Sequence, residues 1–257
     1  MEIKKTCAYC SNTSNFTKEH IFPAAIIKSF NVDLLSVSDK NDYFFKGDLV
    51  IRDVCATCNN GVLSQLDQHF IKSFKNQMIT PLKPGDEVTF NYDYDLLLRV
   101  LLKISYNSAR ASKNGYSSKV ILEKYKSFIA HGEKKPDGII VSLLIVTSAN
   151  RINLETGNDE KPLEPYLLRS GLIDGLNLSS NNYIVRMVAF NSFWFYLLIP
   201  KKPVNAKVKK QFWDEFKSKT HLHGVLLKKN DTSIKITKDK TTYLHHSLMS
   251  RMVRLSK

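Results

Sequence analysis

Cys7-Ala8-Tyr9-Cys10 and Cys55-Ala56-Thr57-Cys58 are two CxxC pairs, and together they contain every cysteine of this 257-residue chain. Two such pairs supply four thiolates, which are the full ligand set of a closed, tetrahedral Zn²⁺ site. A zinc ion held by these four cysteines would join two pieces of chain that lie far apart in the sequence. We therefore expect a structural zinc site to determine the fold of the N-terminal region.

The segments around the two pairs carry polar residues that could form an active site. Lys18-Glu19-His20-Ile21-Phe22-Pro23 lies between the pairs, and Asn59-Asn60-Gly61 follows the second pair directly. Residues 16–21 can extend as a strand, residues 44–54 can supply the opposing strand, and Cys58 can begin a helix. The apolar face of that helix would consist of Val62, Leu63, Leu66, Phe70 and Phe74. The sequence thus predicts a strand–strand–helix unit with the zinc at its base.

The combination of CxxC, EHIxP and VCxxCNN, followed by a helix with an acidic residue, resembles the HNH endonuclease family. It is most similar to the zinc-stapled bacterial members, and the resemblance covers about residues 5–75. The family has the ββα-metal fold and hydrolyses phosphodiester bonds. The resemblance implies that His20 is the general base, and that Glu19 and Asn59 hold a catalytic Mg²⁺ or Mn²⁺. Asn60 or Asp67 could supply a further contact.

The chemistry of these side chains agrees with the roles that the resemblance implies. A neutral histidine can take a proton from water near pH 7, and a divalent ion offsets the charge that develops on a phosphate. Oxygens of Glu and Asn are hard ligands that suit Mg²⁺ or Mn²⁺, whereas thiolates select zinc. Many family members have Asp where this chain has Glu19. The Asn that usually orients the catalytic histidine has no clear counterpart before Cys55, although Asn41 is a candidate.

The rest of the chain predicts an α+β fold with antiparallel hairpins. We expect residues 1–77 to form the metal-binding module and residues 78–257 to form an α+β domain. Helices are expected at 93–112, 118–130, 204–219 and 241–255. A buried strand is expected at 138–147, a loop at 150–161, and hairpins from 182–190 with 193–199 and from 222–228 with 233–237.

The charge of the chain indicates an anionic partner. Its formal net charge is +14 and its sequence pI is about 9.5. Residues 201–257 contain 15 Lys and Arg residues against four acidic residues. This concentration predicts an electrostatic footprint for nucleic acid, although a solvated face that only improves solubility stays open. On the basic helix at 204–219 the candidate phosphate contacts are Lys207, Lys209, Lys210 and Lys217.

The sequence favours a cytoplasmic protein that does not enter a membrane. Its first residues have no apolar segment of the secretory type, and its longest apolar runs are as short as strands. Thiols stay reduced in the cytosol, which favours metal binding over disulfides.

Three functions remain as alternatives. The first is a metal-dependent HNH endonuclease that cuts DNA, which the resemblance places in restriction or anti-phage defence, as a homodimer or with a partner protein of a defence system. The second is a non-catalytic zinc-stabilised module that binds nucleic acid or protein. The third is an HNH toxin that cleaves RNA.

Overall fold

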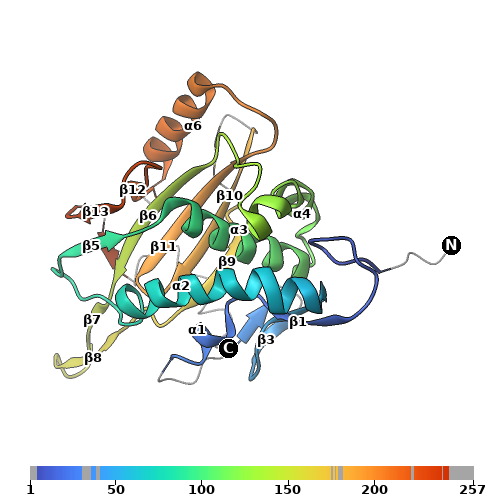
Figure 1. Cartoon of the computed structure of the whole chain (residues 1–257). Coiled ribbons are helices and arrows are strands. Elements are labelled where there is room, and N and C mark those ends of the chain that lie inside the picture. Colours follow the sequence, from blue (N-terminus) through green and yellow to red (C-terminus); the bar gives the residue numbers. More distant parts are fainter. Residues whose placement is uncertain are drawn as a thin grey trace.

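The computed structural model describes residues 5–30, 36–38, 41–174, 176, 178, 182–220, 223–238 and 240–242. Helices and antiparallel strands are mixed along the chain, which confirms the predicted α+β class (Figure 1). Among the described residues, no helix combines the length and the apolar character that a bilayer crossing requires.

The N-terminal strands and helix follow the predicted order. β1 (Phe16–His20) pairs with β4 (Val50–Cys55) in antiparallel fashion. A π-helical segment, η1 (Cys58–Leu63), follows β4 and runs into α2 (Ser64–Gln77). Gly61 has non-helical backbone angles (φ −97°, ψ −107°) that mark a kink inside η1.

Three short elements fill the connection between β1 and β4. They are α1 (Ala24–Ile27), β2 (Ser36–Ser38) and β3 (Asn41–Phe45), and the last two form a small antiparallel pair. Asn41, the candidate for orienting the histidine, begins β3, and its side chain lies outside the described part of the structure.

A six-stranded sheet forms the centre of the molecule. Its path is β12-β6-β11-β10-β9, and β14 pairs with β6 in parallel. The three long strands are β6 (Ile140–Thr147), β10 (Tyr183–Phe190) and β11 (Phe193–Pro200), and every residue in them is buried. A strand buried on both faces is continuously apolar, which is why the sequence predicted these elements well. The hairpin of β10 and β11 is confirmed, with Asn191 at positive φ (50°) in its turn.

Helices cover both faces of this sheet. α3 (Tyr94–Ala111) begins at Asp93, whose side chain accepts a hydrogen bond from the backbone N–H of Leu96. α2 and α3 share one core with the strands, whereas α6 (Ala206–Lys219) packs on the opposite face. Figure 1 shows α2 and α3 in front of the sheet and α6 beyond its upper end. Phe212 of α6 stacks on Tyr183 of β10 with ring centroids 4.1 Å apart.

Two expected elements differ in detail from those observed. The helix expected at 118–130 is divided into α4 (Tyr116–Glu123) and α5 (Lys126–His131). The loop expected at 150–161 contains part of a ribbon of β7 (Ala149–Ile152) and β8 (Asp159–Leu163). Most residues of this ribbon are exposed and polar, so the chain shows no apolar alternation there.

The second predicted hairpin is wrong in its pairing. β12 (Val225–Leu226) pairs with β6, and β13 (Ser233–Ile236) pairs with β5 (Val88–Asn91). The strands therefore exist, but each bonds to a distant segment. β9 (Leu168–Leu172) was not expected, and it pairs with β10 at one edge of the sheet. The helix expected at 241–255 lies outside the described residues except for its first two, which belong to β14 (Lys240–Thr242).

The hydrophobic core continues across the predicted boundary at residue 77. One cluster of buried residues includes Cys55 and Phe70 of the N-terminal region together with Leu101 of α3 and Val188 of β10. The division into two domains stays a prediction. The packing means that the site residues of β1 lie against a helix from beyond the predicted boundary, at residues 94–111.

Candidate functional site

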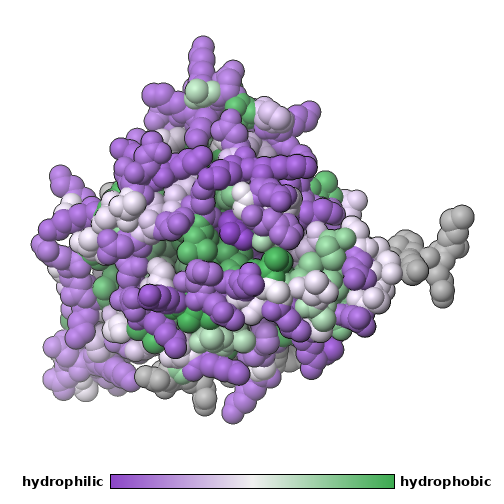
Figure 2. Space-filling model, in the orientation of Figure 1, coloured by the Kyte–Doolittle hydropathy of each residue, from purple (hydrophilic) through white to green (hydrophobic). Residues whose placement is uncertain are grey.

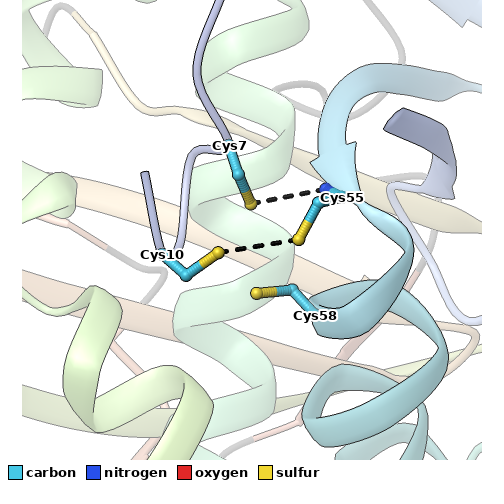
Figure 3. A group of neighbouring side chains, drawn as sticks. All are labelled: Cys7, Cys10, Cys55 and Cys58. Atoms are coloured by element: carbon cyan, nitrogen blue, oxygen red, sulfur yellow. Dashed lines mark hydrogen bonds between the residues drawn. The ribbon is translucent and has the colours of Figure 1, made fainter. Parts of the chain in front are cut away.

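The four cysteines converge, as predicted. Their sulfur atoms all lie within 4.8 Å of one another (Figure 3). Cys10 Sγ is 3.5 Å from Cys55 Sγ, and none of the four forms a disulfide. A zinc–sulfur bond of about 2.3 Å gives tetrahedral sulfur atoms a separation of about 3.8 Å, whereas a disulfide requires about 2.05 Å. The cluster could therefore hold a metal such as zinc.

Backbone hydrogen bonds attach the first cysteine pair to the second. The N–H of Ala8 donates to the carbonyl of Asp53 at 2.9 Å, and the N–H of Ala56 donates to the carbonyl of Asn15 at 2.7 Å. The N–H of Cys55 points at Cys7 Sγ, 3.3 Å away. Hydrogen bonds at the C-terminal end of β4 and in the turn before β1 thus hold the two cysteine pairs next to each other.

The pKa values of the cysteine thiols indicate that the cluster would be stabilised by a bound cation. Burial opposes ionisation of Cys7, but backbone N–H groups outweigh it and lower the pKa of this thiol to about 7. Burial and neighbouring sulfur atoms raise the pKa of Cys58. Four thiols in contact cannot all ionise unless a positive charge offsets their repulsion, and a bound metal ion supplies that charge.

Glu19 lies in the interior, against a lysine. It is 4% exposed, and its Oε1 is 2.7 Å from the Nζ of Lys103 on α3. Lys103 has no exposed side-chain surface and also contacts both carboxylate oxygens of Asp67, at 2.6 and 2.8 Å. Burial alone would lower the pKa of Lys103, but Asp67 and Glu19 outweigh it, so the pKa is raised and the ammonium stays charged.

His20 lies at the surface beside this buried group. Its side chain is 31% exposed, and its Nε2 is 3.1 Å from Oδ2 of Asp48. Neighbouring residues of a strand point to opposite faces, which explains why Glu19 is buried and His20 is not. A carboxylate next to an imidazole fixes the orientation and the tautomer of the ring. Asp48 was not expected as a site residue; the sequence placed it only within residues 44–54, the segment expected to form the opposing strand.

Asn59 connects the start of η1 to β1. Its Nδ2 donates to Thr17 Oγ1 and to the carbonyl oxygen of Lys18, both at 2.9 Å. Asn60 beside it is exposed. Asn59 is therefore held beside β1, the strand that carries Glu19 and His20. No hydrogen bond within the described part of the chain joins Asn59 to either of these two residues. Its assignment as a metal ligand stays a prediction.

The acidic residues that the structure describes do not form a second metal-binding cluster. Within the described ranges, only the four cysteines form a set of three or more His, Cys, Asp or Glu residues close enough to share an ion. Glu19 and Asp67 are instead joined by Lys103. The catalytic Mg²⁺ or Mn²⁺ thus stays an expectation from the resemblance.

α3 supplies site residues that the sequence did not reveal. The helix itself was predicted, but its polar residues were not linked to β1. Asn107 contacts Glu19 and His20, and Arg110 contacts Asp53 at 3.1 Å while lying over the rings of Tyr9 and Tyr106. The available signal was a set of polar side chains, including Lys103, within an otherwise apolar helix.

The four candidate lysines of α6 fall into two groups. Lys210 forms an ion pair with Asp214 at 2.8 Å, and Lys217 lies 3.8 Å from the same carboxylate. Lys207 and Lys209 have no ion pair with any residue that the structure describes. Figure 2 shows hydrophilic residues over the end of the molecule where α6 lies. Lys207 and Lys209 are thus the better candidates for phosphate contacts.

Comparison of the chain with protein-family models, with curated proteins and with solved structures gave no match. A fold of this class serves many functions, so function must be inferred from the residues of the site.

Proposed function

We propose that this protein is a metal-dependent endonuclease of the HNH type that hydrolyses phosphodiester bonds in DNA. The observation that carries the proposal is the position of His20. The strand–strand–helix unit held by the cysteine cluster presents His20, oriented by Asp48, at the surface and next to the buried Glu19. In this proposal the protein acts in the cytoplasm, in restriction or anti-phage defence.

His20 would act as the general base. Its Nε2 faces Asp48, while Nδ1 has no hydrogen bond to any described residue. A neutral imidazole can take a proton from water through this second nitrogen, and the carboxylate of Asp48 then stabilises the imidazolium that forms. Such a base contributes about 10²–10⁴-fold to a rate.

Glu19 and Asn59 would hold the divalent ion. Glu19 bonds to Lys103 and Asn107 through Oε1, and Asn59 donates through its nitrogen. Each therefore keeps one oxygen without a hydrogen bond to the described residues, and hard oxygens suit Mg²⁺ or Mn²⁺. When bound, the ion would offset negative charge on the phosphate and on the leaving oxygen.

His20→Ala is expected to lower kcat about 10²- to 10⁴-fold on DNA in the presence of Mg²⁺ or Mn²⁺. His69→Ala is the matched control, because His69 is an exposed histidine of α2 whose Nδ1 bonds to the carbonyl of Gln65 in its own helix. The assay compares single- and double-stranded DNA with RNA over a range of salt concentrations. Equal activity of His20→Ala and wild type would remove the proposed mechanism, and cleavage of RNA alone would identify the RNA-cleaving alternative.

Replacing Lys207 and Lys209 together with alanine is expected to weaken DNA binding. If each lysine contacts one phosphate, the slope of log K against log salt should fall by about 2 in magnitude. The control replaces Lys83 and Lys161, which are exposed lysines that lie outside α6. Equal binding by the two double variants, measured by fluorescence anisotropy, would exclude α6 as the phosphate-binding surface.

A non-catalytic nucleic-acid-binding module is the second candidate function. The observation that favours it is Lys103, whose ammonium already lies between the carboxylates of Glu19 and Asp67. Salt-sensitive DNA binding without cleavage, unchanged in His20→Ala and independent of Mg²⁺, would support this candidate over the nuclease.

A further inference from the structure

We propose that Asn107, on α3, is a positioning residue that holds His20 and Glu19 and links both to the first cysteine pair through Tyr9. This inference rests on the proposed function, since it assigns a role in the same site. It places one determinant of the site outside the module that the resemblance covers.

Asn107 has three hydrogen-bond partners in the N-terminal region. Its Nδ2 donates to Glu19 Oε1 at 3.2 Å and to the backbone carbonyl of His20 at 3.3 Å. Its Oδ1 accepts from the hydroxyl of Tyr9 at 2.7 Å. The side chain is completely buried, so solvent cannot replace these partners. Two acceptors and one donor surround the amide, and only this orientation of the amide satisfies all three.

Tyr9 brings the cysteine cluster into this arrangement. It lies between Cys7 and Cys10, and its ring packs edge-on against Tyr106 with centroids 5.7 Å apart. The hydroxyl of Tyr9 is the donor in its 2.7 Å hydrogen bond to Asn107, because the amide oxygen Oδ1 can only accept. A single hydrogen bond thereby connects the first cysteine pair to Asn107.

The position of His20 depends on its backbone. The imidazole is partly exposed, and its side-chain hydrogen bond is to Asp48, itself 43% exposed. The bond from Asn107 to the carbonyl of His20 is partly buried and holds the end of β1 through its backbone. Because a displacement of about 1 Å can reduce a catalytic rate about 10²-fold, loss of this bond should affect turnover more than substrate binding.

Asn107→Asp is the sharpest test, because it keeps an acceptor for Tyr9 and removes both donated bonds. Tyr9→Phe removes only the hydroxyl that bonds to Asn107. Tyr106→Phe is the matched control, since its hydroxyl contacts the carbonyl of Ala8 at 3.4 Å in the same cysteine pair. Each variant is characterised by zinc content, by kcat and KM, and by the histidine side-chain NMR resonances, with the His20 signal assigned from His20→Ala.

For Asn107→Asp we expect bound zinc, a kcat reduced about 10²-fold with KM within about twofold, and a shifted His20 resonance. Tyr9→Phe should show the same changes at smaller size, and Tyr106→Phe should match wild type. If Asn107→Asp does not fold, Tyr9→Phe decides. A folded, zinc-bound Tyr9→Phe or Asn107→Asp with unchanged kcat and His20 resonance would overturn the positioning role.

The two proposals fail in different measurements. A wild-type protein that cleaves no nucleic acid overturns the proposed nuclease. An unmoved His20 resonance overturns the role of Asn107, and this resonance can be measured whether or not the protein cleaves DNA.

Discussion

Removal of the metal, by a strong chelator or by Cys58→Ser, is expected to unfold the N-terminal strands while the central sheet stays folded. β1 and β4 form only a two-stranded pair, which is marginal without further support. Metal binding to four thiolates contributes apparent free energies of about 10–16 kcal/mol in zinc-finger peptides, so its loss removes the main connection between the two cysteine pairs. The three long strands of the sheet, by contrast, are buried along their whole length.

Limited proteolysis with mass spectrometry measures this effect directly. Metal-free protein should be cut rapidly within residues 5–60, and fragments from residue 138 onward should persist. Added Zn²⁺, but not Mg²⁺, should restore protection to chelated wild type and not to Cys58→Ser. The same cleavage pattern with and without zinc would show that the cysteine cluster is not needed for folding.

Features that depend on residues close together in the sequence could be predicted from the sequence alone. Two CxxC pairs have few uses other than metal binding, and the four sulfur atoms do converge. α3 could be predicted because a run of apolar residues begins at a capping residue, Asp93. The hairpin of β10 and β11 could be predicted because two buried strands flank a short polar turn.

The pairing of the last strands could not be derived in this way. The segments 222–228 and 233–237 have the length and spacing of a hairpin, yet the strands within them, β12 and β13, bond to β6 and β5. That choice depends on where distant strands lie after the sheet has formed, and the sequence of the two segments does not contain this information. Tertiary contacts thus override a local preference.

The site shows the same limit. The resemblance located Glu19, His20 and Asn59 on adjoining elements, but it ended near residue 75. Lys103 and Asn107 lie beyond it, and they reach β1 only because α3 packs there. A lysine within an apolar helix indicates a buried partner, but the sequence alone cannot identify which carboxylate it is.

Lys103→Met is expected to destabilise the protein by about 3–5 kcal/mol, because removal of one member of a buried ion pair leaves an uncompensated charge. Here two carboxylates, Glu19 and Asp67, would lose their cation, and their side chains are only 5% and 18% exposed. Methionine fills a similar volume, so the cost is electrostatic and not a cavity. Lys135→Met is the matched control, since its pair with Asp95 is at the surface and such pairs contribute about 0–1 kcal/mol.

The pH dependence identifies the cause of this loss. In wild type the pKa of Lys103 is raised, so its contribution is fully present at neutral pH. In Lys103→Met the two buried carboxylates have no cation, and their ionised forms should destabilise the fold. The difference from wild type, measured by urea unfolding, should therefore be largest near pH 7 and shrink as pH falls and the carboxylates become protonated. Adding Glu19→Gln to Lys103→Met should recover part of the loss. A Lys103→Met protein within about 0.5 kcal/mol of wild type at pH 7 would show that the buried ion pair makes no net contribution to stability.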